Sequence, residues 1–319
     1  WPPPEERHTP GDPKDGTDIR VALPEAIEPG EELEIEMAWK VSLPSVVLRT
    51  GFVDQFHMVA QWFPKLARLE EDGTWAHFPF ERLSEFYADF GEYDVTITAP
   101  NAYVIAAPGN ASPPERGPEK TRQRYRLSPA HDFAFAVSDD LALFERKTED
   151  GVRLRCFVPS GQDVLAHHQL DVVNEALPYF QKRYGDYPYE SLTIVHPPLR
   201  ASEAGGMEYP GLITTGGRRL PFEMGVRTLA AVTVHELAHQ WFYGLLASNE
   251  HRWPFLDEGL TTFVQAEWMG ARWPGSSAAS VQGIEISIAA INRAHAAAAW
   301  GKGPIARAAA EFESPPPRP

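Results

Sequence analysis

The chain has 319 residues and a formal net charge of −15, because 44 acidic side chains outnumber 29 Lys and Arg side chains. This acidity argues against a nucleic-acid partner, since binding to a phosphate backbone needs a basic face. Cys156 is the only cysteine, which excludes an intrachain disulfide and any zinc module built from several cysteines. A bound metal must therefore be held by His and carboxylate side chains.

No apolar run reaches the roughly 18 residues that a membrane-spanning helix needs. The chain opens at Trp1 without an initiator Met or an apolar targeting segment. We expect a soluble domain whose location, cytoplasmic or exported, stays open.

The first half of the chain has the pattern of an antiparallel β domain. Residues 1–18 are rich in Pro, Gly and charge, and we expect them to form a flexible lead-in. Residues 19–158 follow with short segments of alternating apolar and polar residues, which are typical of half-buried strands. The clearest segments are 32–39, 93–98 and 103–106, with turns expected at Pro29-Gly30 and Asp72-Gly73. We predict a sandwich or a saddle-shaped sheet.

After Gly151 the pattern becomes mainly helical. Apolar residues at helical spacing predict helices over 164–184, 222–246, 256–272 and 278–299, and strands over 192–195 and 212–215. The overall prediction is an α+β chain whose second domain covers residues 159–313. The Pro-rich tail, residues 314–319, cannot continue a helix, and we expect it to be disordered.

The segment His235-Glu236-Leu237-Ala238-His239 has the form H-E-x-x-H. On a helix, residues four apart lie on one face, so both imidazoles can bind one ion. Glu236 projects about 100° around the helix and can act as the general base toward a metal-activated water. The H-E-x-x-H pattern also occurs in helices that bind no metal. A third ligand is therefore needed to distinguish a metal site from a chance match.

Glu258 is the candidate third ligand. It begins a second predicted helix whose apolar stripe would pack against the helix of His235 and His239. Such packing would bring Glu258 over the two histidines. Eighteen residues separate His239 from Glu258.

This spacing, with Glu258 inside W-x-x-L-x-E-G, resembles the M1 family of zinc metallopeptidases, the leukotriene A4 hydrolase-like gluzincin aminopeptidases. Upstream, Gly205-Gly206-Met207-Glu208-Tyr209 is similar to the family's G-x-M-E-N exopeptidase motif, with Tyr209 where Asn is common. Further similar segments are 61–65, 86–90, 131–134 and 187–189.

The resemblance implies a saddle-like β domain followed by a thermolysin-like, mainly α catalytic domain. It implies one zinc ion per chain on His235, His239 and Glu258, and Glu236 as the base. Glu208 would bind the free α-ammonium of a peptide substrate, and Gly205 and Gly206, next to Met207, would let the substrate backbone lie against their strand. Gln61 would line the pocket for the first residue. The implied function is zinc-dependent hydrolysis at the amino terminus of peptides.

The chain departs from the family pattern in its oxyanion donor. Family members use a Tyr downstream of the third ligand, whereas no tyrosine follows Tyr243 here. We interpret the chain as truncated at its carboxyl terminus. The alternatives are a catalytically impaired relative that binds zinc and peptide, and a zinc endopeptidase. His251 and His295 are candidate replacement donors, and Pro254 and Asp257 replace commoner residues beside the third ligand.

Overall fold

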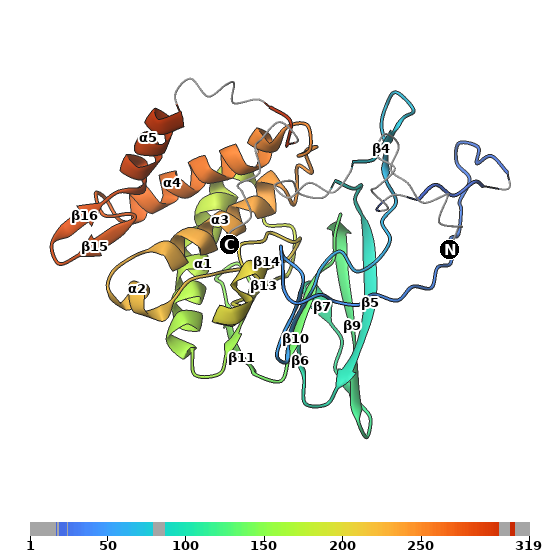
Figure 1. The fold of residues 1–319 in the computed structure, drawn as a ribbon, viewed down its shortest axis with the longest axis horizontal. Helices are drawn as coiled ribbons and strands as arrows, with labels where there is room; N and C mark the ends of the chain where they lie inside the picture. The colour runs from blue at the N-terminus through green and yellow to red at the C-terminus, as the bar shows by residue number, and fades with distance from the viewer. Residues whose placement is uncertain (1–16, 18, 24, 79–86, 300–306, 310–319) are drawn as a thin grey trace.

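The computed structural model describes residues 17, 19–23, 25–78, 87–299 and 307–309 (Figure 1). Strands dominate the first half of this part of the chain and helices the second half, so the predicted α+β class is confirmed. The predicted lead-in, apart from Thr17, and the predicted tail lie outside the described residues.

Two antiparallel sheets form the first half. The first sheet has the order β1-β2-β10-β6, with β1 Gly51–Val53, β2 Phe56–Val59, β10 Phe135–Ser138 and β6 Val104–Ala106. The second has the order β5-β9-β7, with β8 also paired to β9; their bounds are β5 Gly91–Pro100, β9 Lys120–Ala130, β7 Asn110–Ala111 and β8 Glu115–Arg116. The strands predicted over 93–98 and 103–106 are thus confirmed.

Both predicted turns are present. Glu31 N–H donates to the carbonyl of Glu28, and Gly73 N–H donates to the carbonyl of Glu70, each at 3.0 Å. The second turn joins β3 (Arg68–Leu69) to β4 (Trp75–Ala76).

The strand predicted over 32–39 is wrong. This segment has no regular secondary structure and pairs with none of the described strands. Its apolar side chains Leu33, Ile35, Met37 and Trp39 are 40–54% exposed. A period-two pattern specifies which face of a strand would be buried, but a strand also needs a neighbouring edge for its backbone hydrogen bonds.

A third sheet lies beneath the helices, in the order β11-β12-β13-β14. Its strands are β11 Leu141–Lys147, β12 Arg153–Pro159, β13 Ser191–Val195 and β14 Leu212–Thr214. β13 is parallel to both neighbours and buried at every residue, as expected for a central strand covered on both faces. β11 precedes the predicted boundary between residues 158 and 159, and β12 crosses it, yet both belong to this sheet. The boundary itself stays a prediction.

The helices pack in the order α1, α3, α4 (Figure 1). The predicted helix over 164–184 is confirmed by α1, Asp163–Tyr184. The helix predicted over 222–246 is divided into α2, Arg219–Glu223, and α3, Thr228–Phe242. Gly225 causes the break, because its φ is +89° and its carbonyl accepts the N–H of Ser280 at 3.0 Å.

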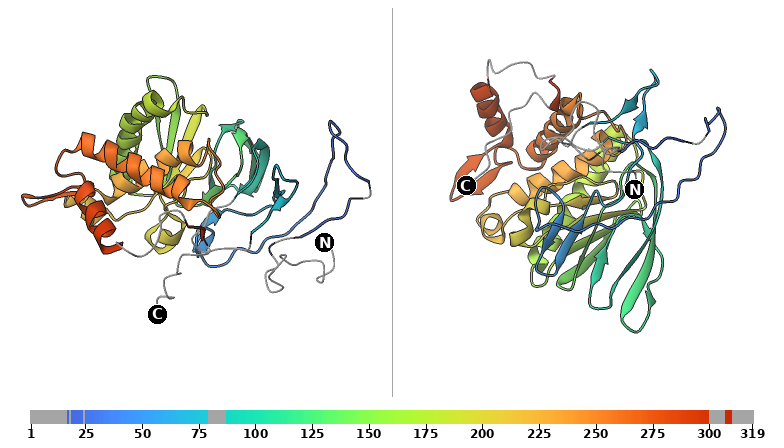
Figure 2. Two further views of the ribbon diagram at one scale, coloured as in Figure 1. Left: turned by 90° about the horizontal axis from the view of Figure 1, so that it is seen from above. Right: turned by 45° about the vertical axis from the view of Figure 1, so that its right-hand side comes forward.

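The helix predicted over 256–272 is present as α4, Leu260–Arg272, and it is preceded by a π-helical turn, η3, Phe255–Gly259. The helix predicted over 278–299 is wrong in its first part. A hairpin of β15 (Ala279–Val281) and β16 (Ile284–Ile286) comes first, turning at Gln282 and Gly283 with φ of +48° and +83°. Only then does α5, Ile288–Ala299, begin. The hairpin and α5 lie on the side of α4 away from the N-terminal sheets (Figure 2).

One buried cluster connects the β half to the helical half. It contains Tyr125 and Leu127 of β9 together with Phe180 of α1 and Trp241 of α3. Beside this cluster, the buried ring of His131 donates from Nε2 to the carbonyl of Tyr243 at 3.2 Å. Among the described residues, no helix combines the length and apolar character that crossing a membrane requires.

The buried His131 predicts a loss of stability in mild acid. Burial lowers its pKa from 6.5 to about 4. Between these values the unfolded chain binds more protons than the folded chain, so the stabilisation by neutral His131 is complete above about pH 6.5 and is lost as pH falls. We expect His131→Asn, which does not titrate, to show a smaller drop in urea midpoint from about pH 7 to about pH 5. An equal drop in both proteins would contradict this origin.

Candidate metal and peptide site

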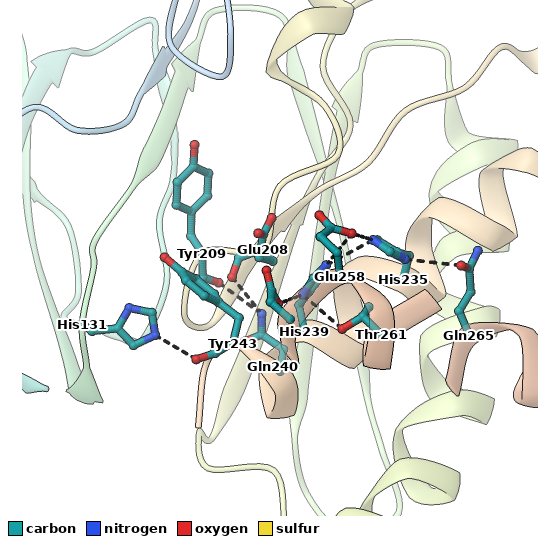
Figure 3. A network of polar contacts seen from close by, with 11 residues as sticks. His131, Glu208, Tyr209, His235, His239, Gln240, Tyr243, Glu258, Thr261 and Gln265 are labelled. Carbon is teal, nitrogen blue, oxygen red and sulfur yellow. Dashed lines mark hydrogen bonds and ion pairs between the residues drawn. The ribbon is translucent and has the colours of Figure 1, made fainter. Parts of the chain in front are cut away.

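Two neighbouring helical segments bring the three predicted ligands together (Figure 3). His235 and His239 lie one turn apart on α3, and Glu258 lies in the π turn η3. The Nε2 atoms of the two histidines are 3.1 Å apart, and Glu258 Oε2 is 3.1 Å from His235 Nε2 and 3.9 Å from His239 Nε2. These atoms lie within 4.8 Å of one another, close enough to bind one metal ion.

The opposite nitrogens of both rings are held by a row of polar side chains. Asp257, Thr261 and Gln265 recur every four residues and therefore share one face of η3 and α4. His239 Nδ1 lies 2.6 Å from Asp257 Oδ1 and 3.2 Å from Thr261 Oγ1. His235 Nδ1 lies 3.3 Å from Gln265 Oε1. We call Asp257, Thr261 and Gln265 the polar row.

The polar row assigns the protons of the two imidazoles. Gln265 Nε2 donates to the carbonyl of Ala231 at 3.0 Å, so its Oε1 is left to accept from His235 Nδ1. The carboxylate of Asp257 likewise accepts from His239 Nδ1. When neutral, both rings therefore direct a lone pair on Nε2 toward the carboxylate of Glu258.

Three electron-pair donors this close repel one another unless a cation lies between them. Two imidazole nitrogens and one carboxylate oxygen are the donor set of a catalytic zinc site, so the residues fit a divalent metal. Without metal, a proton can take its place: burial lowers the pKa of His239, but the charge and hydrogen bond of Asp257 outweigh this and raise it to about 9. Metal binding would displace that proton.

The predicted third ligand is held in its ionised form. Burial raises the pKa of Glu258, but the hydrogen bond from His235 and the charges of both histidines outweigh it and lower the pKa to about 2. An ionised carboxylate is the form that binds metal.

Glu236 lies apart from the ligand atoms, as predicted from the helical rotation. It is 4% exposed, and burial raises its pKa to about 7, although the neighbouring histidines lower it. A Cβ atom on Gly206 would lie 3.7 Å from Glu236 Oε1, so this carboxylate faces the glycine segment. Oε2 has no hydrogen-bond partner among the described residues.

The segment Gly205 to Glu208 runs beside β14 and ends at the ligands. Gly206 N–H donates to Thr214 O at 2.9 Å, and Thr214 N–H donates to Met207 O at 2.7 Å. A Cβ on Gly205 would lie 2.3 Å from Thr215 O, so only glycine fits there. The Met207 side chain is buried in the core, whereas the carboxylate of Glu208 lies within 4.8 Å of ligand atoms of His239, Asp257 and Glu258.

Gln61 lies in the β half, where its Nε2 donates to Asp132 Oδ2 at 2.6 Å. Asp132 also forms an ion pair with Lys65 at 2.8 Å. The role of Gln61 in lining a substrate pocket stays a prediction. Of the two suggested replacement donors, His251 stacks on Phe78 at 4.3 Å and His295 lies on α5.

Comparison with known proteins gives a family match over part of the chain. Residues 168–302 match the peptidase family M1 domain. This part of the chain is similar to a peptidase family M1 domain. His235, His239, Glu258 and Glu208 all lie inside the matched region.

The relatives to which the chain is similar include several that are named as aminopeptidases. The chain is 26% identical to the puromycin-sensitive aminopeptidase of Caenorhabditis elegans over 66% of its own length and 23% of the relative. It is 33% identical to aminopeptidase M1-A of Oryza sativa subsp. japonica over 38% of the chain and 14% of the relative. For the probable M1 family aminopeptidase 1 of Encephalitozoon cuniculi the identity is 27%, over 56% of the chain and 22% of the relative. The chain thus spans less than a quarter of these relatives.

Within the matched region, the polar row was not predicted from the sequence. Asp257, Thr261 and Gln265 recur at every fourth position in the sequence, but this spacing alone does not distinguish a buried polar face of a helix from a solvent-exposed one. The members of the polar row are among the buried polar residues, at 0–9% exposure. Polar side chains spaced four apart in register with an H-E-x-x-H helix are a signal that can be searched for.

We expect Asp257→Ala to weaken Zn²⁺ binding by about 10- to 100-fold, because His239 loses the partner that fixes its ring and tautomer. Asp257→Asn, which keeps an accepting oxygen, should lose less. The measurement is competition for Zn²⁺ against a chelating dye, which needs no turnover. Asp171→Ala, at an exposed ion pair with Arg146, is the matched control. Unchanged affinity in Asp257→Ala would refute the role of the polar row.

Proposed function

We propose that this chain is the metal-bearing portion of a zinc-dependent aminopeptidase, which hydrolyses the first peptide bond of peptides with a free amino terminus. The observation that carries the proposal is the convergence of His235, His239 and Glu258 with Glu208 beside them. The M1 domain and the aminopeptidase names of the relatives support it.

The proposal includes the finer architecture and the cofactor. Residues 19–158 are assigned to a saddle-like β domain and residues 159–313 to a thermolysin-like domain. One Zn²⁺ would be held by His235, His239 and Glu258, and it would supply Lewis acidity toward a water molecule and the substrate carbonyl.

Glu236 is the proposed general base. Burial raises the pKa of Glu236 above its ordinary value, which makes its carboxylate a better proton acceptor than an exposed one. One carboxylate oxygen takes a proton from the attacking water and then passes it to the departing amine nitrogen. The carboxylate faces the glycine segment, so a peptide lying there would place its first peptide bond between Glu236 and the ligands.

Glu208 is the proposed anchor for the substrate ammonium. It is 3% exposed, so a charge-assisted hydrogen bond to its carboxylate is little weakened by water. A peptide interior offers no cation to this carboxylate, which gives selectivity for a free amino terminus. Gly206, next to Met207, leaves room for the substrate backbone beside Glu236, whereas Gly205 lets this segment pack closely against the backbone of Thr215.

Glu236→Gln should lower kcat by at least about 100-fold while Zn²⁺ content is retained, because the amide cannot accept the proton. The assay is hydrolysis of aminoacyl-fluorophores by the zinc-loaded protein, with metal content measured on the same samples. Glu267→Gln, an exposed carboxylate on α4 near Arg183, is the matched control. Full activity in Glu236→Gln would remove Glu236 from the chemistry.

Glu208→Gln should lower kcat/KM for free-amine substrates by at least about 10-fold, because a charge-assisted hydrogen bond is lost. Acetylating the substrate amine should abolish cleavage by the unchanged protein. Efficient cleavage of acetylated peptides would instead identify an endopeptidase. Stoichiometric Zn²⁺ and peptide binding without any turnover would identify a catalytically impaired relative.

A further inference from the structure

The side chain of Gln240 connects α3, the helix of His235 and His239, to the loop that carries Glu208. Gln240 follows His239 directly on α3 and is fully buried. Its Oε1 accepts the N–H of Gly211 at 2.9 Å. Its Nε2 donates to the carbonyls of Tyr209 at 3.2 Å and Glu208 at 3.4 Å (Figure 3). One amide therefore holds three backbone groups of a single loop.

The loop held in this way is a tight turn. Leu212 N–H donates to the carbonyl of Tyr209 at 2.9 Å, with Pro210 and Gly211 between them. Gly211 has a φ of +69°, and Pro followed by Gly at the two central positions is the pattern of a type II turn. The turn is stiff within itself, so attaching it to α3 fixes the carbonyl of Glu208 as well.

His239 and Gln240 point in different directions from the same helical turn. Consecutive helical residues project about 100° apart, so one side chain faces the ligand atoms and the next faces the loop. The carboxylate of Glu208 lies within 4.8 Å of the His239 and Glu258 ligand atoms. The distance from the metal ligands to Glu208 therefore depends on hydrogen bonds made by one residue of α3.

We propose that Gln240 is a positioning residue for recognition of the substrate ammonium: it fixes the spacing between the Glu208 carboxylate and the metal ligands, and so directs cleavage to the first peptide bond. This inference rests on the proposed function, in which Glu208 binds the ammonium. Glutamine suits the role because its amide supplies an acceptor and two donors from one rigid plane. A glutamate keeps the acceptor for Gly211 N–H and has at most one donor, its O–H when protonated, in place of two.

The test separates positioning from a general structural role by using two ligands that differ only in the amino group. Alanine hydroxamate and propionohydroxamic acid carry the same metal-binding group, and only the first carries the ammonium. The affinity ratio of the two ligands on the zinc-loaded protein reports ammonium recognition alone. Damage to the metal site or to the fold would weaken both ligands together.

In Gln240→Glu we expect the ratio to fall by about 3- to 10-fold, as expected for loss of one or two hydrogen bonds, with Zn²⁺ content unchanged. Gln169→Glu is the matched control. Gln169 is also a fully buried glutamine on a helix, but it binds Thr215 Oγ1 at 2.6 Å and the carbonyl of Leu165, away from the turn. Its ratio should match that of the unchanged protein.

Glu208→Gln separates this inference from the function on which it rests. If Glu208→Gln removes the preference for alanine hydroxamate and Gln240→Glu keeps it within about twofold, the role of Gln240 is overturned while the ammonium anchor stands. If Glu208→Gln also keeps the preference, the proposed ammonium anchor is overturned. Should Gln240→Glu not fold, Gln240→Met has a similar size without the hydrogen bonds, and the same outcomes apply.

Discussion

The site depends on the side-by-side packing of α3 against η3 and α4. Apolar residues of the two helices supply most of the contact, among them Val234 and Ala238 on α3 and Val264 and Trp268 on α4. Apolar packing alone is tolerant of small rotations and shifts. The hydrogen bonds of the polar row to His235 and His239 remove that freedom, because each bond requires one side chain on each helix. The positions of the metal-ligand atoms therefore depend on how the two helical segments pack together.

The same residues explain how a dense group of ionisable side chains exists in a protein interior. His239, Asp257, Glu236 and Glu208 are all almost fully buried. Burying a charge is costly unless partners compensate. Asp257 is paired with His239, and the ionised Glu258 is paired with both histidines. Glu236 Oε2 has no hydrogen-bond partner among the described residues, and burial raises the pKa of this carboxyl.

Much of the site was predictable from the sequence because its spacing reflects helix geometry. Two histidines four residues apart can bind one ion only on a helix, and a stripe of apolar residues predicted which helix covers them. The structure brings His235, His239, Glu258 and Glu208 together as expected. The hydrogen bonds of Gln240 to a turn more than 25 residues upstream were not predictable, because they require the relative placement of two segments.

The fold was predictable where the residue pattern of a segment is enough to specify its conformation. α1 has a continuous apolar face, and β13 is apolar enough to be central. Prediction failed where the conformation of a segment depends on the neighbouring segment with which it pairs. The alternating segment 32–39 has no described strand beside it, and the residues near Gly283 form a hairpin although flanking alanines favour a helix.

The π turn at Phe255–Gly259 bears on how relatives of this chain should be aligned. A π turn is what an α-helix becomes when it accommodates one extra residue. This turn lies at the start of the helical segment and leads directly into α4. Here the turn includes Asp257 and Glu258, while Thr261 and Gln265 follow it. A homologue lacking one residue in this stretch would shift Asp257 and Glu258 relative to Thr261 and Gln265, even if every other position of the motif were identical. Alignments should place gaps here by helix geometry rather than by residue count.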